Sequence, residues 1–409
     1  MWFFAKIRSI KLPLECKKLI ILNTLFQGGR FFVGAICFLY FLSFNLVSKD
    51  YAWIKITQAI VFIGLDLPIG YFLSKLGEFK SLIVSIFFGI LGSLGYLFFT
   101  NFFGFLVSEI FLALSLSTWP VALSAYSMQV LEKYPITGLT EKFFHLSDAI
   151  SNIFIFVCGF FGGVFYIYNK RLPYGIFLSF YLLAILFIKF FLKDFGLEEK
   201  KDKAIVNIFN LKIKDVMLVF PLASIIFLTQ FLMQPLFHYW QSFFSDVFGV
   251  ESKNMSIIFV SYSFLTSSIS FSYSKLTQIT FLRTRRFVLL SALFSSIFYC
   301  FFAKVSNLYV SLFFFSLVFG IFNLVQVSSG VLIQHKLKQE NRMIMIKFIS
   351  FYSRIGMLLS LIILHCLFAN LWKLKDIYQL YGFFSISVFA LFLIWTIRQS
   401  KVKMIKIYE

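Results

Sequence analysis

The sequence predicts an all-α polytopic membrane protein, with twelve transmembrane helices in two six-helix halves related by pseudo-symmetry. The chain has 409 residues, of which 60% are hydrophobic and only 14% are charged. A soluble globular protein with this balance could not hide its apolar surface from water. In addition, apolar runs of roughly 20 residues, long enough to cross about 30 Å of hydrocarbon, recur along the whole chain.

The apolar runs define the expected spans. They lie at residues 19–47, 52–74, 81–99, 102–131, 143–168, 174–192, 216–248, 255–274, 287–303, 307–333, 344–368 and 378–397. The one long charge-rich interruption, 193–215, predicts a cytoplasmic linker. We therefore expect an N-terminal half at 1–192, beginning with a basic segment at 1–18, and a C-terminal half at 216–409, ending in a tail at 398–409.

Basic residues predict the orientation of these spans, because Lys and Arg accumulate on the cytoplasmic side of a membrane. With the N-terminus inside, and with Lys55 and Lys347 at the span ends counted with the adjoining segments, the cytoplasmic side holds 27 Lys and Arg and the outer side holds 8. We expect a multi-pass protein of a bacterial inner membrane with both termini in the cytoplasm. The net charge of +20 comes from short clusters between apolar runs, which favours orientation in a lipid bilayer over nucleic-acid binding.

An internal repeat supports the division into halves. Ser74-Lys75-Leu76, after the second span, recurs as Ser274-Lys275-Leu276 after the eighth span, at an offset of 200. Ser147 and Ser353, at the entries of spans five and eleven, are in register at an offset of 206. Two matches at nearly the same offset indicate a duplicated six-helix unit.

The stretch "GYFLSKLGEFK" after span two resembles the signature of the major facilitator superfamily. Gly70, Lys75 and Gly77 match that signature, whereas Ser74 stands where the family has Asp. The resemblance implies the twelve-helix transporter fold and a cytoplasmic gate latched near this turn. Asp66, four residues before Gly70, is a candidate to replace the missing acid of the latch.

A second partial motif lies in span five, where "CGFFGGVF" resembles the Gly-Pro-x-x-Gly-Gly stretch of antiporters in the same superfamily. Gly162 and Gly163 match, and Cys158-Gly159 replaces Gly-Pro. The alternative is helix packing through a small-residue face formed by Gly159 and Gly163. Both interpretations stay open at this point.

Two charged residues inside the N-terminal spans are candidates for proton coupling and substrate binding. Arg30 lies near the middle of span one, and Glu109 lies about 10 Å below the outer end of span four, at 1.5 Å per residue. The resemblance implies that spans one and four line a central cavity together. Arg30 could meet Glu109 or an anionic substrate group there, and the alternative is a buried structural ion pair.

Asp148 in span five and Arg354 in span eleven occupy neighbouring or equivalent places in the two repeats. We expect them to form a gate contact, with simple solvation of Asp148 at the interface as the alternative.

The C-terminal half offers neutral polar groups. Gln230, Gln234 and His238 recur every four residues on one face of span seven, where Pro235 is expected to break the helix and free backbone carbonyls. Asn323 and Gln326 share a face of span ten. The resemblance makes spans seven and ten cavity-lining, and hydrogen bonding between helices is the alternative role for the amides.

These features favour a proton-coupled exporter of a small amphipathic or antibiotic- or peptide-like compound. A proton-coupled importer of a sugar, peptide or siderophore, or a flippase of lipid-linked oligosaccharides, is the alternative. No expected outer loop exceeds about ten residues, so we expect no enzyme. The scattered Cys and His residues predict neither disulfides nor a metal site, and no P-loop is present. We expect a monomer without cofactors, whose partners are the solute, protons and lipid.

Overall fold

The computed structural model describes residues 13–66, 68, 76–131, 133–134, 139–193, 213–251, 254–276, 285–336 and 339–408. In these ranges the regular structure consists of thirteen helices, and no strand is present. Helices occupy all twelve ranges expected to span a membrane, with the first range divided between two helices.

The chain forms two compact units. Unit 1 contains Met1–Ala35 and Gly64–Lys203, and unit 2 contains Ile36–Ile63 and Ala204–Glu409. The units and the expected halves share a division within 193–215. They differ in the segment Ile36–Ile63, which makes its contacts in unit 2.

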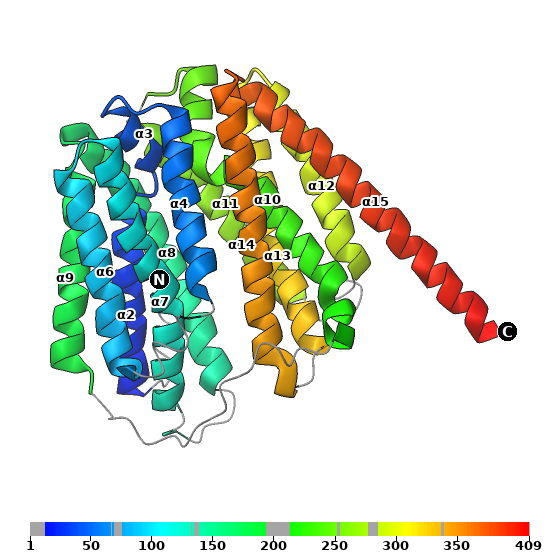
Figure 1. The fold of residues 1–409 in the computed structure, drawn as a ribbon, viewed down its shortest axis with the longest axis horizontal. Helices are drawn as coiled ribbons and strands as arrows, with labels where there is room; N and C mark the ends of the chain where they lie inside the picture. The colour runs from blue at the N-terminus through cyan, green and yellow to red at the C-terminus, as the bar shows by residue number, and fades with distance from the viewer. Residues whose placement is uncertain are drawn as a thin grey trace. The chain divides into compact units, whose positions relative to one another are not determined.

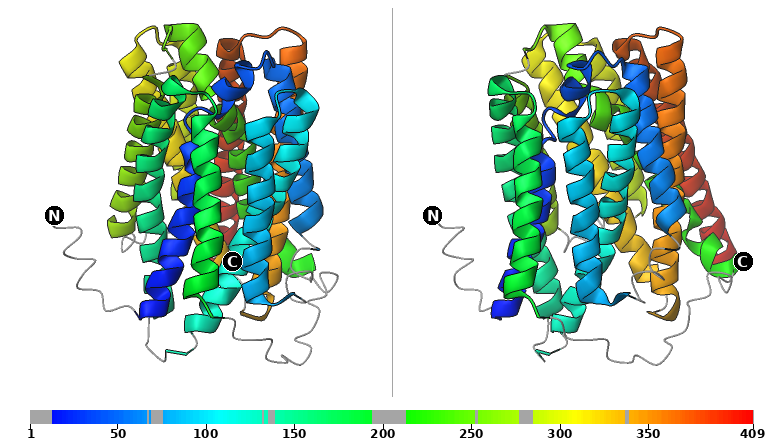
Figure 2. Two further views of the ribbon diagram at one scale, coloured as in Figure 1. Left: turned by 90° about the vertical axis from the view of Figure 1, so that its left-hand side faces the viewer. Right: turned by 60° about the vertical axis from the view of Figure 1, so that its left-hand side comes forward.

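Unit 1 is built from five long helices. Its helix α2 lies against α8 and α9, and α6 lies against α7 and α9 (Figures 1 and 2). Glycines allow these close approaches: a Cβ on Gly92 of α6 would lie 3.0 Å from the backbone of α7 at Leu112. The bounds are α2 Leu14–Phe32, α6 Glu78–Phe98, α7 Phe102–Leu131, α8 Leu139–Tyr168 and α9 Leu172–Phe191.

The first expected span is not one continuous helix. Helix α2 ends at Phe32, a turn follows, and the short helix α3 runs over Cys37–Leu42. Gly34 in the turn weakens a helix at this point, since glycine disfavours helix interiors. The carbonyl of Phe32 packs directly on Gly162 of α8, where any Cβ would collide with its oxygen. The expectation of an unbroken helix over 19–47 is therefore wrong.

Unit 2 contains α3, most of α4 and six further helices. Helix α10 contacts α13 and α14, and α12 lies between α13 and α15 (Figure 1). The bounds are α4 Ser48–Asp66, α10 Ile213–Phe248, α11 Met255–Leu276, α12 Arg285–Lys304, α13 Leu308–Lys336, α14 Gln339–Ala369 and α15 Leu374–Tyr408.

Helix α10 continues through Pro235, so the expected break is wrong. Proline lacks the N–H that would donate to the carbonyl of Phe231, four residues earlier in the helix. Two buried tyrosine hydroxyls donate to carbonyls at this place. Tyr378 donates to Pro235 at 3.0 Å, and Tyr299 donates to Leu232 at 3.1 Å. These bonds join α12 and α15 to α10 beside the proline.

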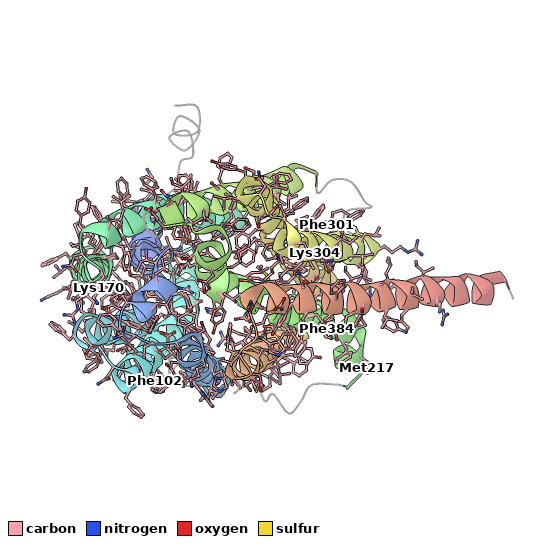
Figure 3. All side chains as sticks on the ribbon, turned by 90° about the horizontal axis from the view of Figure 1, so that it is seen from above. Phe102, Lys170, Met217, Phe301, Lys304 and Phe384 are labelled. Atoms are coloured by element: carbon pink, nitrogen blue, oxygen red, sulfur yellow. The ribbon has the colours of Figure 1, made fainter. Side chains whose placement is uncertain are left out.

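The outer surfaces of the helices suit a lipid environment. Eight of the described helices are long and apolar enough to cross a membrane, namely α6, α7, α9, α10, α12, α13, α14 and α15. Helices α8 and α11 contain shorter apolar stretches, Ile153–Tyr168 and Met255–Ile269. Large apolar side chains are exposed on these helices, including Phe301 on α12 and Phe384 on α15, both labelled in Figure 3. The protein is a multi-pass membrane protein.

Candidate functional site

Glu109 is a buried acid in unit 1. Its side chain lies on α7, is 0% exposed, and accepts a hydrogen bond from the hydroxyl of Tyr96 on α6. The Tyr96 ring packs against Phe105 and Tyr174, with centroids 5.8 and 5.1 Å away. The described contacts thus hold this carboxyl in the interior of unit 1, between α6 and α7.

Arg30 lies in the last turn of α2 and is exposed. Its guanidinium carbon is 5.3 Å from the centroid of the ring of Phe31, the next residue of the same helix. The contacts described for Arg30 and for Glu109 thus involve different aromatic residues. Their pairing with each other stays a prediction.

A second polar group of unit 1, centred on Asn23, was not predicted. The Asn23 amide nitrogen donates to the hydroxyls of Ser147 and Ser151, each at 3.1 Å. Its amide oxygen accepts a hydrogen bond from the Trp119 indole at 3.3 Å. All four side chains are buried, and they join α2, α7 and α8. The only sign of this network in the sequence analysis was Ser147, which is in register with Ser353 in the internal repeat.

Aromatic stacking extends the Asn23 network. The Phe26 ring lies between two others, 4.0 Å from Trp119 and 4.9 Å from Tyr181, and is nearly parallel to both. These rings fix α2 against α7 and α9, so the interior of unit 1 is closely packed.

In unit 2 the predicted amides of α10 lie together. The Gln234 side-chain nitrogen is 3.0 Å from the main-chain carbonyl oxygen of Gln230 and 3.5 Å from its side-chain oxygen. Gln234 is buried, and Gln230 is partly exposed. The four-residue spacing therefore places both amides on one helix face, as predicted.

A further amide, on helix α13, lies near this part of α10. The Gln326 side-chain nitrogen lies 3.6 Å from the sulfur of Met233, the residue before Gln234. Asn323, one turn earlier on α13, has no side-chain hydrogen bond within the described part of the chain. We call Gln230, Gln234, Asn323 and Gln326 the amide cluster.

Two rings continue the same helix faces. Phe237 follows Gln234 by three residues on α10, and Phe319 precedes Asn323 by four residues on α13. Their centroids are 4.7 Å apart, with the rings nearly perpendicular. Phe237 is 43% exposed, so one ring surface beside the amide cluster is accessible.

His238 continues the α10 face and contacts the segment Ile36–Ile63. Its Nδ1 lies 3.4 Å from the hydroxyl of Tyr51 on α4. One turn further along α10, Gln241 accepts hydrogen bonds from the backbone N–H groups of Phe38 at 2.9 Å and Leu39 at 3.3 Å. Gln241 thereby caps the start of α3. Gln241 lies three residues after His238 and seven after Gln234. This helical spacing could have predicted that it shares their face of α10.

Arg354 contacts the last part of α4. Its Nη1 donates to the carbonyl of Phe62 at 3.2 Å, and the guanidinium carbon lies 4.7 Å from the Phe62 ring centroid. A cation near a helix C-terminus is stabilised by the helix dipole and the free carbonyls. The sequence did not indicate this contact with α4.

The other predicted gate residues are described in part. Gly77 has a φ of 79° and caps the start of α6, a backbone conformation that favours glycine. Asp66 ends α4 and Asp148 lies within α8, but their side chains are outside the described residues. Gly70 and Lys75 also lie outside them. The gate contact between Asp148 and Arg354 stays a prediction.

Comparison with known proteins gives a clear result for structure. No family description and no curated protein matches the sequence. The solved structure of the nucleoside transporter NupG matches with a TM-score of 0.74 at 11% identity, covering 93% of this chain and 98% of that one. A bacterial homologue of the human lysosomal transporter Spinster, inward-facing and unoccupied, matches with a TM-score of 0.62 at 13% identity, covering 93% and 94%.

These structures extend along almost the whole chain, including both units. The similarity at such low identity concerns the arrangement of the helices, and it agrees with the resemblance found at the turn around Gly77. The chain therefore has the fold of these transporter structures.

Proposed function

We propose that the chain is a secondary transporter of a small, neutral, ring-bearing polar solute, with nucleosides as the first class to test. The observation that carries this proposal is the amide cluster on α10 and α13 of unit 2. Polar side chains inside a membrane protein are expensive, and they mark solute pathways unless they are used in packing.

The amide cluster has hydrogen-bonding capacity to spare. A glutamine side chain offers two donors and an oxygen with two acceptor sites. Gln326 directs its described bond at a thioether sulfur, which is a weak acceptor, and Asn323 makes none within the described residues. Three of the four side chains are partly exposed. A solute with several hydrogen-bonding groups would therefore find partners here.

The neighbouring rings favour a solute with a flat ring. Phe237 and Phe319 lie on the same helix faces as the amides, and aromatic faces stack on rings. The amide cluster itself contains no charged side chain, which favours a neutral solute. The nucleoside named for one of the similar structures has both properties, a flat base and several polar groups.

Glu109 is the proposed proton-coupling group, with Arg30 as the charge that influences it. The carboxyl is enclosed by rings, so a proton can enter or leave only when unit 1 rearranges. This would link a proton to the transport cycle.

Transport is to be measured in both directions, as export and as import. The glycine stretch of span five is a weak argument for export, because the contact between Gly162 and the Phe32 carbonyl gives that stretch a role in packing.

The experiment is counterflow in proteoliposomes loaded with unlabelled nucleosides, sugars or dipeptides, with the labelled compound outside. We expect labelled nucleoside to accumulate in nucleoside-loaded vesicles. Asn323→Leu should weaken this exchange, whereas Ser316→Ala should not, because the Ser316 hydroxyl bonds only to the Leu312 carbonyl of its own helix in the described structure. Exchange of sugars or dipeptides alone would contradict the nucleoside class, and wild-type exchange by Asn323→Leu would contradict the site.

A further inference from the structure

Arg285, the first residue of α12, holds its charge against an aromatic ring. Its guanidinium carbon lies 4.6 Å from the centroid of Trp395 on α15. The Nε and Nη2 atoms are enclosed, and neither has a hydrogen-bond partner within the described structure. Enclosed donors of a charged group are costly to leave without an acceptor. The stacking on Trp395 does not supply one.

This pair lies at one end of two neighbouring membrane helices. Arg285 begins the apolar helix Arg285–Lys304, and Trp395 lies three residues before the end of the apolar stretch Leu374–Arg398. At the opposite end of α12, Lys304, labelled in Figure 3, stands 5.3 Å from the Phe383 ring, so the two helices run antiparallel. Tryptophan and arginine at span ends mark the level of the lipid headgroups.

The surroundings of Arg285 are basic. Arg286 and Arg398 are exposed at the same end of α12 and α15. No acid is paired with Arg285 among the described residues. The distribution of Lys and Arg predicts that this end faces the cytoplasm, where anionic lipids attract basic residues.

We propose that Arg285 and Trp395 form a binding site for the phosphate of an anionic phospholipid. Guanidinium matches phosphate through paired N–H groups, and its plane stays stacked on the indole while it does so. The phosphate oxygens would supply acceptors for Nε and Nη2, which have none within the described structure. Because both atoms are enclosed, the lipid would reach them only when the side chains around the guanidinium move apart. Trp395 is 41% exposed, so its ring is open to the first carbons of the acyl chains. This position at the end of two spans favours a lipid over a phosphate ion from solution.

Native mass spectrometry of the purified full-length chain tests the site. Lipid occupancy is measured during titration with phosphatidylglycerol, and with phosphatidylcholine of the same acyl chains as the neutral counterpart. We expect Arg285→Ala to weaken phosphatidylglycerol binding by about tenfold, the change produced by losing one charge-assisted bidentate contact. Arg285→Lys, which keeps the charge without the planar fork, should lose part of the affinity and confirms that the protein remains folded.

Lys304→Ala is the matched control, because it removes one charge from the other end of the same helix. Its phosphatidylglycerol affinity should equal that of the wild type. Inorganic phosphate at the same concentration as the lipid should leave lipid occupancy unchanged. The proposal is overturned if Arg285→Ala binds like the wild type, if Lys304→Ala loses as much, or if inorganic phosphate displaces the lipid. None of these measurements depends on transport activity.

Discussion

The two units use buried amides in different ways. In unit 1, Asn23 donates both amide hydrogens to serines and accepts from an indole, so the described bonds use both of its donors. In unit 2, both described bonds of the Gln234 amide nitrogen go to Gln230 of its own helix, and the one described bond of Gln326 goes to a thioether sulfur. An amide with its donors used joins helices, whereas an amide with donors and acceptors left over can recognise a solute. Polarity within a span does not by itself distinguish these roles.

The largest expected effect concerns Glu109. Glu109→Gln should reduce gradient-driven accumulation of the solute to the level of empty liposomes, because the amide still accepts from Tyr96 but carries no titratable proton. Counterflow, which needs no net proton movement, should persist. Ser108→Ala is the control, since the hydroxyl of this buried neighbour bonds to Gly104 of its own helix. Normal accumulation by Glu109→Gln would contradict the proton-coupling role of Glu109.

Arg30→Ala, tested in the same way, should also abolish accumulation.

The next effect tests the amide cluster. Gln234→Leu should raise the KM for the solute about tenfold, since one lost hydrogen bond in a buried site is worth about 1–3 kcal/mol. The measurement is the concentration dependence of counterflow. Thr229→Val on the same helix should leave KM unchanged, because the described bonds of Thr229 go only to backbone carbonyls of α10. If the wild type, Gln234→Leu and Thr229→Val all had the same KM, Gln234 would have a role in helix packing and none in solute binding.

A smaller effect, on stability, is expected in unit 1. Asn23→Leu leaves two serine hydroxyls and the Trp119 indole without their partner, which costs about 1–3 kcal/mol. The unfolding temperature of the purified protein should fall by about 3 °C, while the KM for the solute stays the same. Gln234→Leu should show the opposite pattern. A raised KM in Asn23→Leu would mean that the Asn23 network contacts the solute, and the contrast between the units would fail.

The smallest effect concerns a surface contact of unit 1. The Tyr134 hydroxyl donates to Glu15 at 2.5 Å, and this bond lowers the pKa of the Glu15 carboxyl below its usual value. A lowered pKa in the folded state stabilises the protein at neutral pH, and this stabilisation is lost as the pH falls through the folded-state pKa. Tyr134→Phe should lower the unfolding temperature at pH 7 by no more than about 1 °C. A difference that persists unchanged at acidic pH would mean that the hydroxyl does not act through the ionised Glu15 carboxylate.

The spans were predictable because apolar runs of sufficient length leave few alternatives, and each expected range holds a helix. The face of α10 was also predictable, since Gln230, Gln234 and His238 follow the helical period. The role of Asn23 was not, because its partners lie more than 90 residues away and a single amide in an apolar run has no period. The break after Phe32 depends on the contact with Gly162, which no local pattern reveals.

The segment Ile36–Ile63 has a consequence for dividing the protein experimentally. Because it makes its contacts in unit 2, the backbone passes from one unit to the other at three places, after Ala35, Ile63 and Lys203. Cutting the chain within 193–215 severs one of these passages and leaves two intact. A fragment ending there would carry Phe38 and Tyr51 without Gln241 and His238, so separately expressed halves should be soluble in detergent only when they are produced together.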